Sequence, residues 1–163
     1  MPKSFIPIAD EHARILILGT MPSVESRKVG FYYAHPRNRF WKVIANIFRN
    51  PLPQSVKEKT RLLLANYIAL WDVLASCEIS GSDDSSIREP TYNDIGSFIT
   101  DKPIKKVLCN GRKAYEFCLK LELPIPVLYM PSTSPANAAW SSERLTAVWK
   151  LELMTIESKE RKI

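Results

Sequence analysis

Short apolar runs and amphipathic stretches alternate along the chain. Residues 15–18 are four consecutive aliphatic residues that end at Gly19. Such a run, without polar alternation, is typical of a strand buried on both faces of a parallel sheet. Similar runs predict strands at 67–73, 106–109 and 127–130. Helical spacing of the apolar residues predicts helices at 38–48, 55–66, 93–100, 112–121 and 142 to about 156, and residues 80–86 read as a polar loop.

Because predicted strands and helices alternate, the fold class is expected to be α/β. The arrangement that buries all of these apolar faces is a three-layer α/β/α sandwich around a central parallel sheet of about four strands. No repeat or linker divides the chain, so we expect one domain over residues 1–163. The charged tail at 157–163 is expected to fray.

Charge and composition narrow the class of protein. The net charge is +6 and the pI is about 9.3, which favours an anionic partner, most commonly nucleic acid. No apolar run approaches the roughly 20 residues that a membrane span requires, and residues 1–12 do not resemble a signal peptide. The three cysteines have no metal-binding spacing. We therefore expect a cytoplasmic protein with reduced thiols, no membrane association, no metal and no cofactor.

Candidate chemistry is sought at the carboxyl ends of the strands, where sheets of this class bind ligands. These loops are 19–23, the residues from Asp72 onward, 110–111 and 131–135. They contain no phosphate-binding, dinucleotide-binding or nucleophile-elbow motif. They offer amide, hydroxyl and aromatic side chains instead, a set that can stack on a flat ring and read its edge, as a flipped base requires. The set comprises Tyr32, Tyr33, Asn38, Asn110, Ser132 and Ser134.

Three segments carry a family resemblance. Residues 31–44 contain Ala-His-Pro-Arg-Asn-Arg-Phe-Trp, which is similar to the Ala-His-Pro-x-Asn-Arg-Phe-Trp run of mismatch-specific uracil/thymine DNA glycosylases. Residues 17–23 take the place of the Gly-Ile-Asn-Pro-Gly loop of those enzymes, and 130–138 resemble their Pro-Ser motif. Together with residues 70–74 and the Asn-Gly at 110–111, the chain most resembles the hypoxanthine-DNA (deoxyinosine) glycosylase branch of the uracil-DNA glycosylase superfamily, over about residues 12–150.

This resemblance implies a DNA glycosylase of base-excision repair. It would flip a deaminated base, hypoxanthine, out of DNA and hydrolyse the N-glycosidic bond, leaving an abasic site. The partner would be DNA containing a damaged base. Water is the only co-substrate, so no cofactor is implied, and a monomer is expected because one lesion needs one pocket.

The resemblance also assigns residues. Met21 stands where many superfamily members have an Asn or Asp that positions the attacking water. In the hypoxanthine branch that role belongs to the Asn of the later His-Pro-x-Asn motif, which is Asn38 here, so the resemblance implies that Asn38 is the catalytic residue. The expected base-binding residues are Gly19, Thr20, Met21, Tyr33, His35 and Asn110, and the expected DNA-backbone contacts are Pro22, Ser23, Ser132, Thr133 and Ser134.

Structural roles remain open for several of these residues. Asn38 is also suited to cap the helix that follows it, and Asn110 to form an Asn-Gly turn. Tyr33 and His35 can be core or loop side chains. Asp72 and Asp94 are the acidic candidates if a general base exists, although each suits an N-cap or a structural role.

Two other functions also remain open. One is a uracil or G:U/G:T mismatch-specific DNA glycosylase. The other is a non-catalytic DNA-binding module, which the missing Asn or Asp at position 21 suggests. A small-molecule enzyme has no phosphate or cofactor loop to support it.

Overall fold

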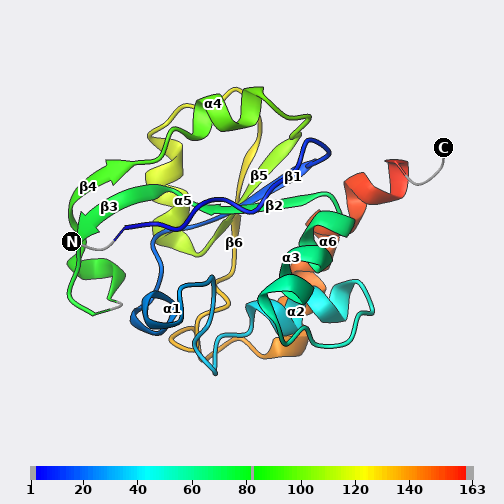
Figure 1. The fold of residues 1–163 in the computed structure, drawn as a ribbon, viewed down its shortest axis with the longest axis horizontal. Coiled ribbons are helices and arrows are strands. Elements are labelled where there is room, and N and C mark those ends of the chain that lie inside the picture. Colours follow the sequence, from blue (N-terminus) through cyan, green and yellow to red (C-terminus); the bar gives the residue numbers. More distant parts are fainter. Residues whose placement is uncertain (1–2, 82, 161–163) are drawn as a thin grey trace.

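A four-stranded parallel sheet lies at the centre of the protein. The computed structural model describes residues 3–81 and 83–160 (Figure 1). The strands are β1 (Ile15–Gly19), β2 (Ile68–Asp72), β5 (Lys106–Asn110) and β6 (Val127–Met130), in the order β2-β1-β5-β6. All three pairings are parallel. This confirms the predicted sheet, and the order brings the loops after β1, β2, β5 and β6 to one edge.

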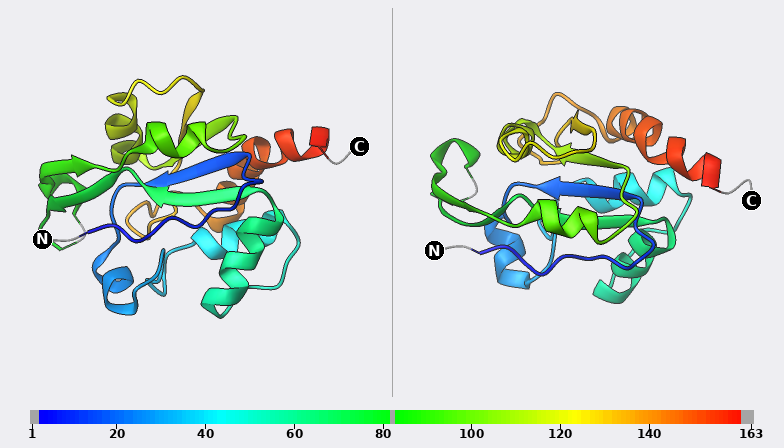
Figure 2. Two further views of the ribbon diagram at one scale, coloured as in Figure 1. Left: turned by 45° about the horizontal axis from the view of Figure 1, so that its top comes forward. Right: turned by 90° about the horizontal axis from the view of Figure 1, so that it is seen from above.

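Helices cover both faces of this sheet, as Figures 1 and 2 show. On one face, Ile15 and Ile17 of β1 pack in a core with α2 (Phe40–Ile47), α3 (Val56–Ala65) and α6 (Ser142–Glu160). On the other face, Leu16 and Leu18 pack with α4 (Ile95–Thr100) and α5 (Arg112–Leu119). Alternate residues of β1 thus enter two different cores, which explains why the strand has no polar positions. The predicted three-layer arrangement is confirmed.

The helix boundaries follow local hydrogen bonding. The Ser55 side chain accepts a hydrogen bond of 3.0 Å from the backbone N–H of Glu58, which starts α3. Helix α2 begins at Phe40, after the expected start at 38, and its last helical residue is Ile47. Helix α6 continues past the expected end at about 156 and reaches Glu160. Residues 161–163 of the expected frayed tail lie outside the described residues.

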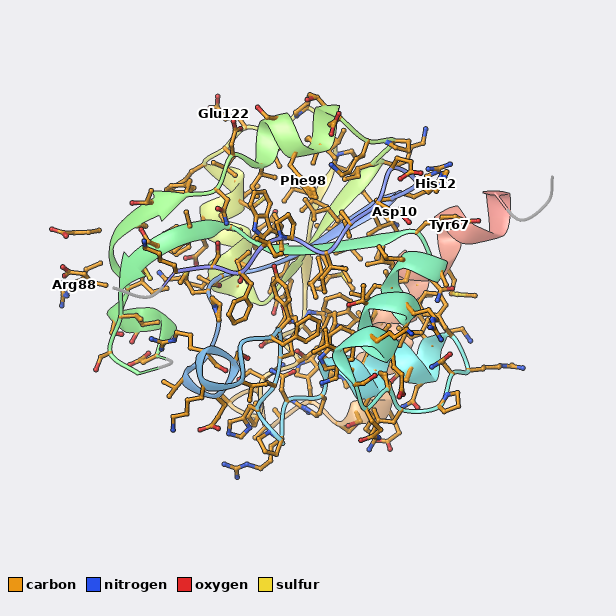
Figure 3. All side chains as sticks on the ribbon, in the orientation of Figure 1. Asp10, His12, Tyr67, Arg88, Phe98 and Glu122 are labelled. Atoms are coloured by element: carbon orange, nitrogen blue, oxygen red, sulfur yellow. The ribbon has the colours of Figure 1, made fainter. Side chains whose placement is uncertain are left out.

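Several elements were not predicted from the apolar pattern. Helix α1 (Val24–Val29) follows Ser23, whose side chain accepts from the backbone N–H of Ser26, and it ends at Gly30 with φ of 85°. An antiparallel hairpin of β3 (Leu74–Glu78) and β4 (Arg88–Tyr92) extends beyond β2. A short 3-10 helix, η1 (Asp84–Ser86), lies within the predicted polar loop. Strand β4 is exposed over four of its five residues, and Figure 3 shows Arg88 pointing away from the body of the protein.

In the part of the chain that the structure describes, no helix is both long and apolar enough to cross a membrane.

Candidate active site

A pocket opens where the carboxyl ends of the parallel strands meet. Its volume is about 140 Å³, close to the roughly 150 Å³ cavity that holds a benzene-sized ring in other proteins. A flat heteroaromatic ring can therefore enter it. The pocket is lined by Gly19, Thr20, Met21, Pro22, Ser23, Ser26, Tyr32, Tyr33, Asn38, Asp72, Ile79, Asn110, Ser132, Thr133 and Ser134.

The pocket gathers every site residue expected from the sequence except His35. The Nδ1 atom of His35 accepts a hydrogen bond of 3.0 Å from the backbone N–H of Arg37, in the turn before α2. Ser26 and Ile79 also line the pocket and were not foreseen. Ser26 belongs to the unpredicted helix α1 and Ile79 follows the unpredicted strand β3, so only a correct assignment of those elements could have pointed to them.

One side of the pocket is a hydrogen-bonded set that we call the amide wall: Asn38, Asn110 and Thr133. The Thr133 backbone N–H donates to Asn110 Oδ1 at 3.0 Å, and Asn110 Nδ2 donates to Thr133 Oγ1 at 3.0 Å. The Thr133 hydroxyl then donates to Asn38 Oδ1 at 2.9 Å. Asn38 Oδ1 also accepts from the backbone N–H of Phe40 at 2.9 Å. Thr133 itself is 1% exposed.

The direction of every bond in the amide wall is set by two backbone N–H groups, which can only donate. The N–H of Thr133 identifies the oxygen of Asn110, and the N–H of Phe40 identifies the oxygen of Asn38. Both lone pairs of Asn38 Oδ1 are therefore occupied. Asn38 Nδ2 makes no hydrogen bond with the described residues, so it is the amide group that Asn38 offers to a ligand.

A second part of the pocket is a polar surface that we call the carboxylate floor: Gly19, Tyr32, Tyr33 and Asp72. Gly19 and Asp72 are register partners at the ends of β1 and β2, and Asp72 is 3% exposed. A Cβ atom on Gly19 would lie 2.6 Å from Asp72 Oδ1 and 2.8 Å from the Tyr33 hydroxyl. Glycine is needed at position 19 because any side chain would displace these two groups.

The surroundings of the two tyrosines in the carboxylate floor keep Tyr32 protonated and hold the Tyr33 ring in place. Burial raises the pKa of Tyr32, and the negative charge of Asp72 and the neighbouring Tyr33 raise it further. Tyr32 is therefore neutral, and its hydroxyl donates to the carbonyl of Ile6 at 2.7 Å. Tyr33 has φ of 51°, unusual for a residue other than glycine. Its ring stacks on Phe40 with centroids 4.2 Å apart, which holds the ring at the pocket.

The rim of the pocket is held by an arginine. The Arg39 guanidinium donates to the backbone carbonyls of Thr133 at 3.4 Å, Ser134 at 2.7 Å and Asn137 at 3.1 Å, and also to the carbonyl of Trp140. We call this set the Arg39 clamp. It fixes residues 133–140 against the start of α2, because one planar guanidinium spans several carbonyls of the same loop.

Two further features position the rim. The Trp149 indole N–H donates to the carbonyl of Pro131 at 3.0 Å. Gly111 has φ of 98°, and a Cβ there would lie 3.3 Å from Ser132 Cβ, so the Asn-Gly pair lets the 131–134 loop approach Asn110. The hydroxyls of Ser23 and Ser132 accept local backbone N–H bonds, from Ser26 and Ser134 respectively.

Among residues 3–81 and 83–160, no group of three or more His, Cys, Asp or Glu side chains is placed to hold a metal ion.

Comparisons with known proteins agree with this architecture. Residues 6–152 match the model of the uracil DNA glycosylase superfamily. A protein of Methanosarcina acetivorans named hypoxanthine DNA glycosylase is 35% identical over 145 residues, which is 87% of this chain and 92% of the relative. A protein of the same name from Methanosarcina barkeri is 36% identical over 118 residues, covering 71% of this chain and 74% of the relative.

A solved structure shares the fold as well. The solution NMR structure of a candidate uracil DNA glycosylase from Methanosarcina acetivorans superposes with a TM-score of 0.79 at 32% identity, covering 93% of this chain and 98% of the other. The family model and the first relative each span most of the sequence, and the range of the family model includes all four strands of the parallel sheet. The chain therefore belongs to the uracil DNA glycosylase superfamily and is a DNA glycosylase, a hydrolase of N-glycosyl bonds.

Proposed function

We propose that this glycosylase removes hypoxanthine from deoxyinosine in DNA and leaves an abasic site for base-excision repair. The observation that carries the proposal is the pocket itself. It has the size of a flat ring, it lies at the carboxyl ends of the strands, and it holds the Asn38 amide in one orientation. Two relatives named hypoxanthine DNA glycosylase support the choice of base. An inosine pair is weaker than a normal pair, so the base is flipped at lower cost.

In this proposal Asn38 is the catalytic residue and acts through Nδ2. Cleavage of the glycosidic bond places positive charge on the sugar and negative charge on the departing base. Since such a transition state depends on the position of the water more than on its basicity, an N–H donor that holds the water oxygen is sufficient. The family resemblance assigns the positioning of the water to Asn38, and an amide group can hold a water through its oxygen or its nitrogen. The bonds from Phe40 and Thr133 to that oxygen favour the nitrogen instead.

The other pocket residues bind the base. Tyr33 offers a ring already stacked on Phe40, and the backbone at Gly19, Thr20 and Met21 lines the pocket as a source of donors for the oxygen of the base. Asn110 keeps one N–H and one lone pair beyond its bonds to Thr133, and these can read the edge of the base. We leave His35 out of this set because it does not line the pocket.

The rim would contact the DNA backbone beside the lesion. Pro22, Ser23, Ser132 and Ser134 line the pocket; the three serines are half-buried and Pro22 is buried. Thr133 is 1% exposed and supports the amide wall. Thr133 would therefore contribute backbone rather than side chain to the rim. We further propose one domain acting as a monomer, because a single chain supplies the whole pocket. A cytoplasmic location fits three buried cysteines, none of which is part of a disulfide.

The test is a cleavage assay without added metal. Labelled duplexes carrying one deoxyinosine, one uracil or one G:T mispair are incubated with the protein and with Asn38→Ala, and hot alkali then reveals abasic sites. Cleavage at deoxyinosine that is lost in the variant supports the proposal. Cleavage only at uracil or G:T keeps the family and overturns the base. DNA binding without cleavage of any substrate would make the protein a non-catalytic module, against the proposal.

A further inference from the structure

The hairpin of β3 and β4 supplies a pocket residue, Ile79, that the proposed mechanism does not use. We propose that Ile79 is a specificity residue, which limits through its size how large a base the pocket accepts. The inference rests on the proposed function, since it requires a flipped base in this pocket.

An irregular strand brings Ile79 to the pocket. The register between β3 and β4 shifts on either side of Ser76. Leu74 and Cys77 are both 0% exposed, although residues three positions apart lie on opposite faces of a regular strand. A bulge of this kind redirects the side chains that follow it. Ile79, two positions after Cys77, therefore turns inward, where it packs against the same core and lines the pocket.

An arginine of α1 ties this part of the hairpin to the pocket. Arg27 Nη2 donates to the carbonyl of Gly81 at 2.8 Å, and Arg27 Nε donates to the carbonyl of Ser23 at 3.4 Å. Ser23 lines the pocket, and Gly81 lies two residues beyond Ile79. One planar guanidinium thus joins the hairpin to the loop after β1, which holds Ile79 in place.

The chemistry of the side chain points to a limit on size. Isoleucine offers no hydrogen-bonding group to a base, and its branched Cβ restricts χ1, so it presents a hydrocarbon surface of defined shape. Hypoxanthine and uracil each present an N–H donor next to a carbonyl oxygen, so this donor and acceptor pair does not separate them. They differ in size, because hypoxanthine has two fused rings and uracil has one. A hydrophobic wall discriminates between ligands by their size.

The other parts of the pocket have little room to compensate for a change at this wall. The amide wall is fixed by directed hydrogen bonds. The carboxylate floor is packed closely around Gly19, and the Arg39 clamp holds the rim. A larger or smaller side chain at position 79 therefore changes the space that is left for the base.

Ile79 in this role does not act on the bond that breaks. Its substitution should change which bases are accepted more than the rate common to all of them. This separates Ile79 from Asn38, whose loss should slow cleavage of every base.

The experiment uses Ile79→Phe, which enlarges the side chain, and Ile79→Ala, which removes most of it. The matched control is Ile87→Phe, because Ile87 lies in the same hairpin and packs against the same core without lining the pocket. Single-turnover cleavage is measured on duplexes carrying deoxyinosine or deoxyuridine, and circular dichroism checks the fold. Binding of free uracil, hypoxanthine, 2-methylhypoxanthine and 8-methylhypoxanthine is measured by NMR titration. The two methylated bases are larger but keep the N–H and the carbonyl oxygen.

We expect Ile79→Phe to lower both cleavage of deoxyinosine and affinity for hypoxanthine by at least about tenfold, since one methylene in a hydrophobic pocket changes selectivity by roughly 10- to 200-fold. Affinity for uracil should fall less, because uracil needs less space. Ile79→Ala should improve the binding of at least one methylated base relative to hypoxanthine by about tenfold. Ile87→Phe should keep the preferences of the native protein.

Two results would overturn the inference. One is an equal loss of affinity for hypoxanthine and uracil in Ile79→Phe, which indicates a general disturbance of the pocket. The other is an unchanged order of affinities in Ile79→Ala, and this variant decides the matter if Ile79→Phe does not fold. A native protein that leaves deoxyinosine intact would refute the proposed function, and the titrations with free bases would then still decide the role of Ile79, because they need no cleavage.

Discussion

The two sides of the pocket are built in different ways. The amide wall joins three residues far apart in sequence: Asn38 and Thr133 are 95 positions apart, and Asn110 and Thr133 are 23 apart. Its bonds are directed by the backbone N–H groups of Phe40 and Thr133. The carboxylate floor is built around Gly19 and Asp72, which are register partners in the adjacent strands β1 and β2. The amide wall is thus a chain of mutually dependent hydrogen bonds. The arrangement of the carboxylate floor depends mainly on the room that the missing side chain of Gly19 leaves for Asp72 and Tyr33.

This difference suggests a division of labour. A chain of directed bonds can hold one amide N–H in a single orientation, which is what positioning of a water requires. The carboxylate floor instead shapes the space that a base enters, because a Cβ atom on Gly19 would displace Asp72 and Tyr33. Changes in the wall should therefore affect the cleavage rate of all bases, and changes in the floor should affect both fit and preference.

The largest loss of cleavage is expected from substitutions of Asn38 in the amide wall. Asn38→Ala should lower single-turnover cleavage of deoxyinosine by about 10²- to 10³-fold, as loss of one well-placed donor does in other enzymes. Asn38→Asp should be impaired nearly as much. Its Oδ1 can still accept from Phe40 and Thr133, but its second oxygen replaces the Nδ2 donor.

Asn38→Asp also separates two roles for this residue. If Asn38 acts as an acceptor for the water, a carboxylate should preserve or increase the rate, and our assignment to Nδ2 would be wrong. Thermal unfolding of both variants checks that the start of α2 remains intact.

The next largest effect is expected in the carboxylate floor. Gly19→Ala should reduce cleavage of deoxyinosine by roughly tenfold or more, because its Cβ would push Asp72 and Tyr33 out of position. It should also destabilise the fold by about 1–3 kcal/mol, the usual cost of overpacking. The matched control is Gly96→Ala in α4, where the nearest atom to the new Cβ is Asp94 Oδ1 at 3.8 Å. Melting temperature and cleavage rate are measured for both, and normal activity in Gly19→Ala would remove the floor from the mechanism.

The sequence predicted much of this architecture. Strands such as 15–18 were identified because both of their faces are buried, which leaves an unbroken apolar run. The residues that follow the four strands were identified as site loops, and each of these loops contributes residues to the pocket. This works because a parallel sheet brings those loops together whatever their side chains are.

The features that the sequence did not predict depend on contacts rather than on patterns. Strand β4 was missed because it is mostly exposed and, among the described strands, pairs with β3 alone. The inward position of Asp72 follows from its register with Gly19, which only the assembled sheet defines. The support that Thr133 gives to Asn38 and Asn110 likewise requires distant loops to meet. His35 has a signature motif around it, but its local bond to Arg37 does not bring it to the pocket.

A smaller effect is expected at the centre of the amide wall. Thr133→Val keeps the shape of the side chain but removes the hydroxyl that links Asn110 to Asn38. Cleavage should fall by roughly tenfold on every base, since Asn38 loses one of the two bonds that orient it. The variant should also lose about 0.5–1.5 kcal/mol of stability, because the half-buried Asn110 Nδ2 loses its partner. Thr133→Ser retains the hydroxyl and should be close to the native protein; equal losses in Val and Ser variants would point to packing instead of hydrogen bonding.

The smallest effect is expected at the rim, which both sides of the pocket share. Arg39→Lys should weaken binding to a deoxyinosine duplex by a few-fold, because an ammonium cannot reach the carbonyls of Ser134, Asn137 and Trp140 together. The matched control is Arg37→Lys, an exposed neighbour. Binding is measured as a function of salt concentration. Each lost phosphate contact reduces the slope of log K against the logarithm of salt concentration by about one. Charge is conserved in both Lys variants, so Arg39→Ala completes the series. Since the Arg39 guanidinium bonds to the protein's own carbonyls, its removal should lower affinity with an unchanged slope, and a slope reduced by about one would show that Arg39 contacts a phosphate.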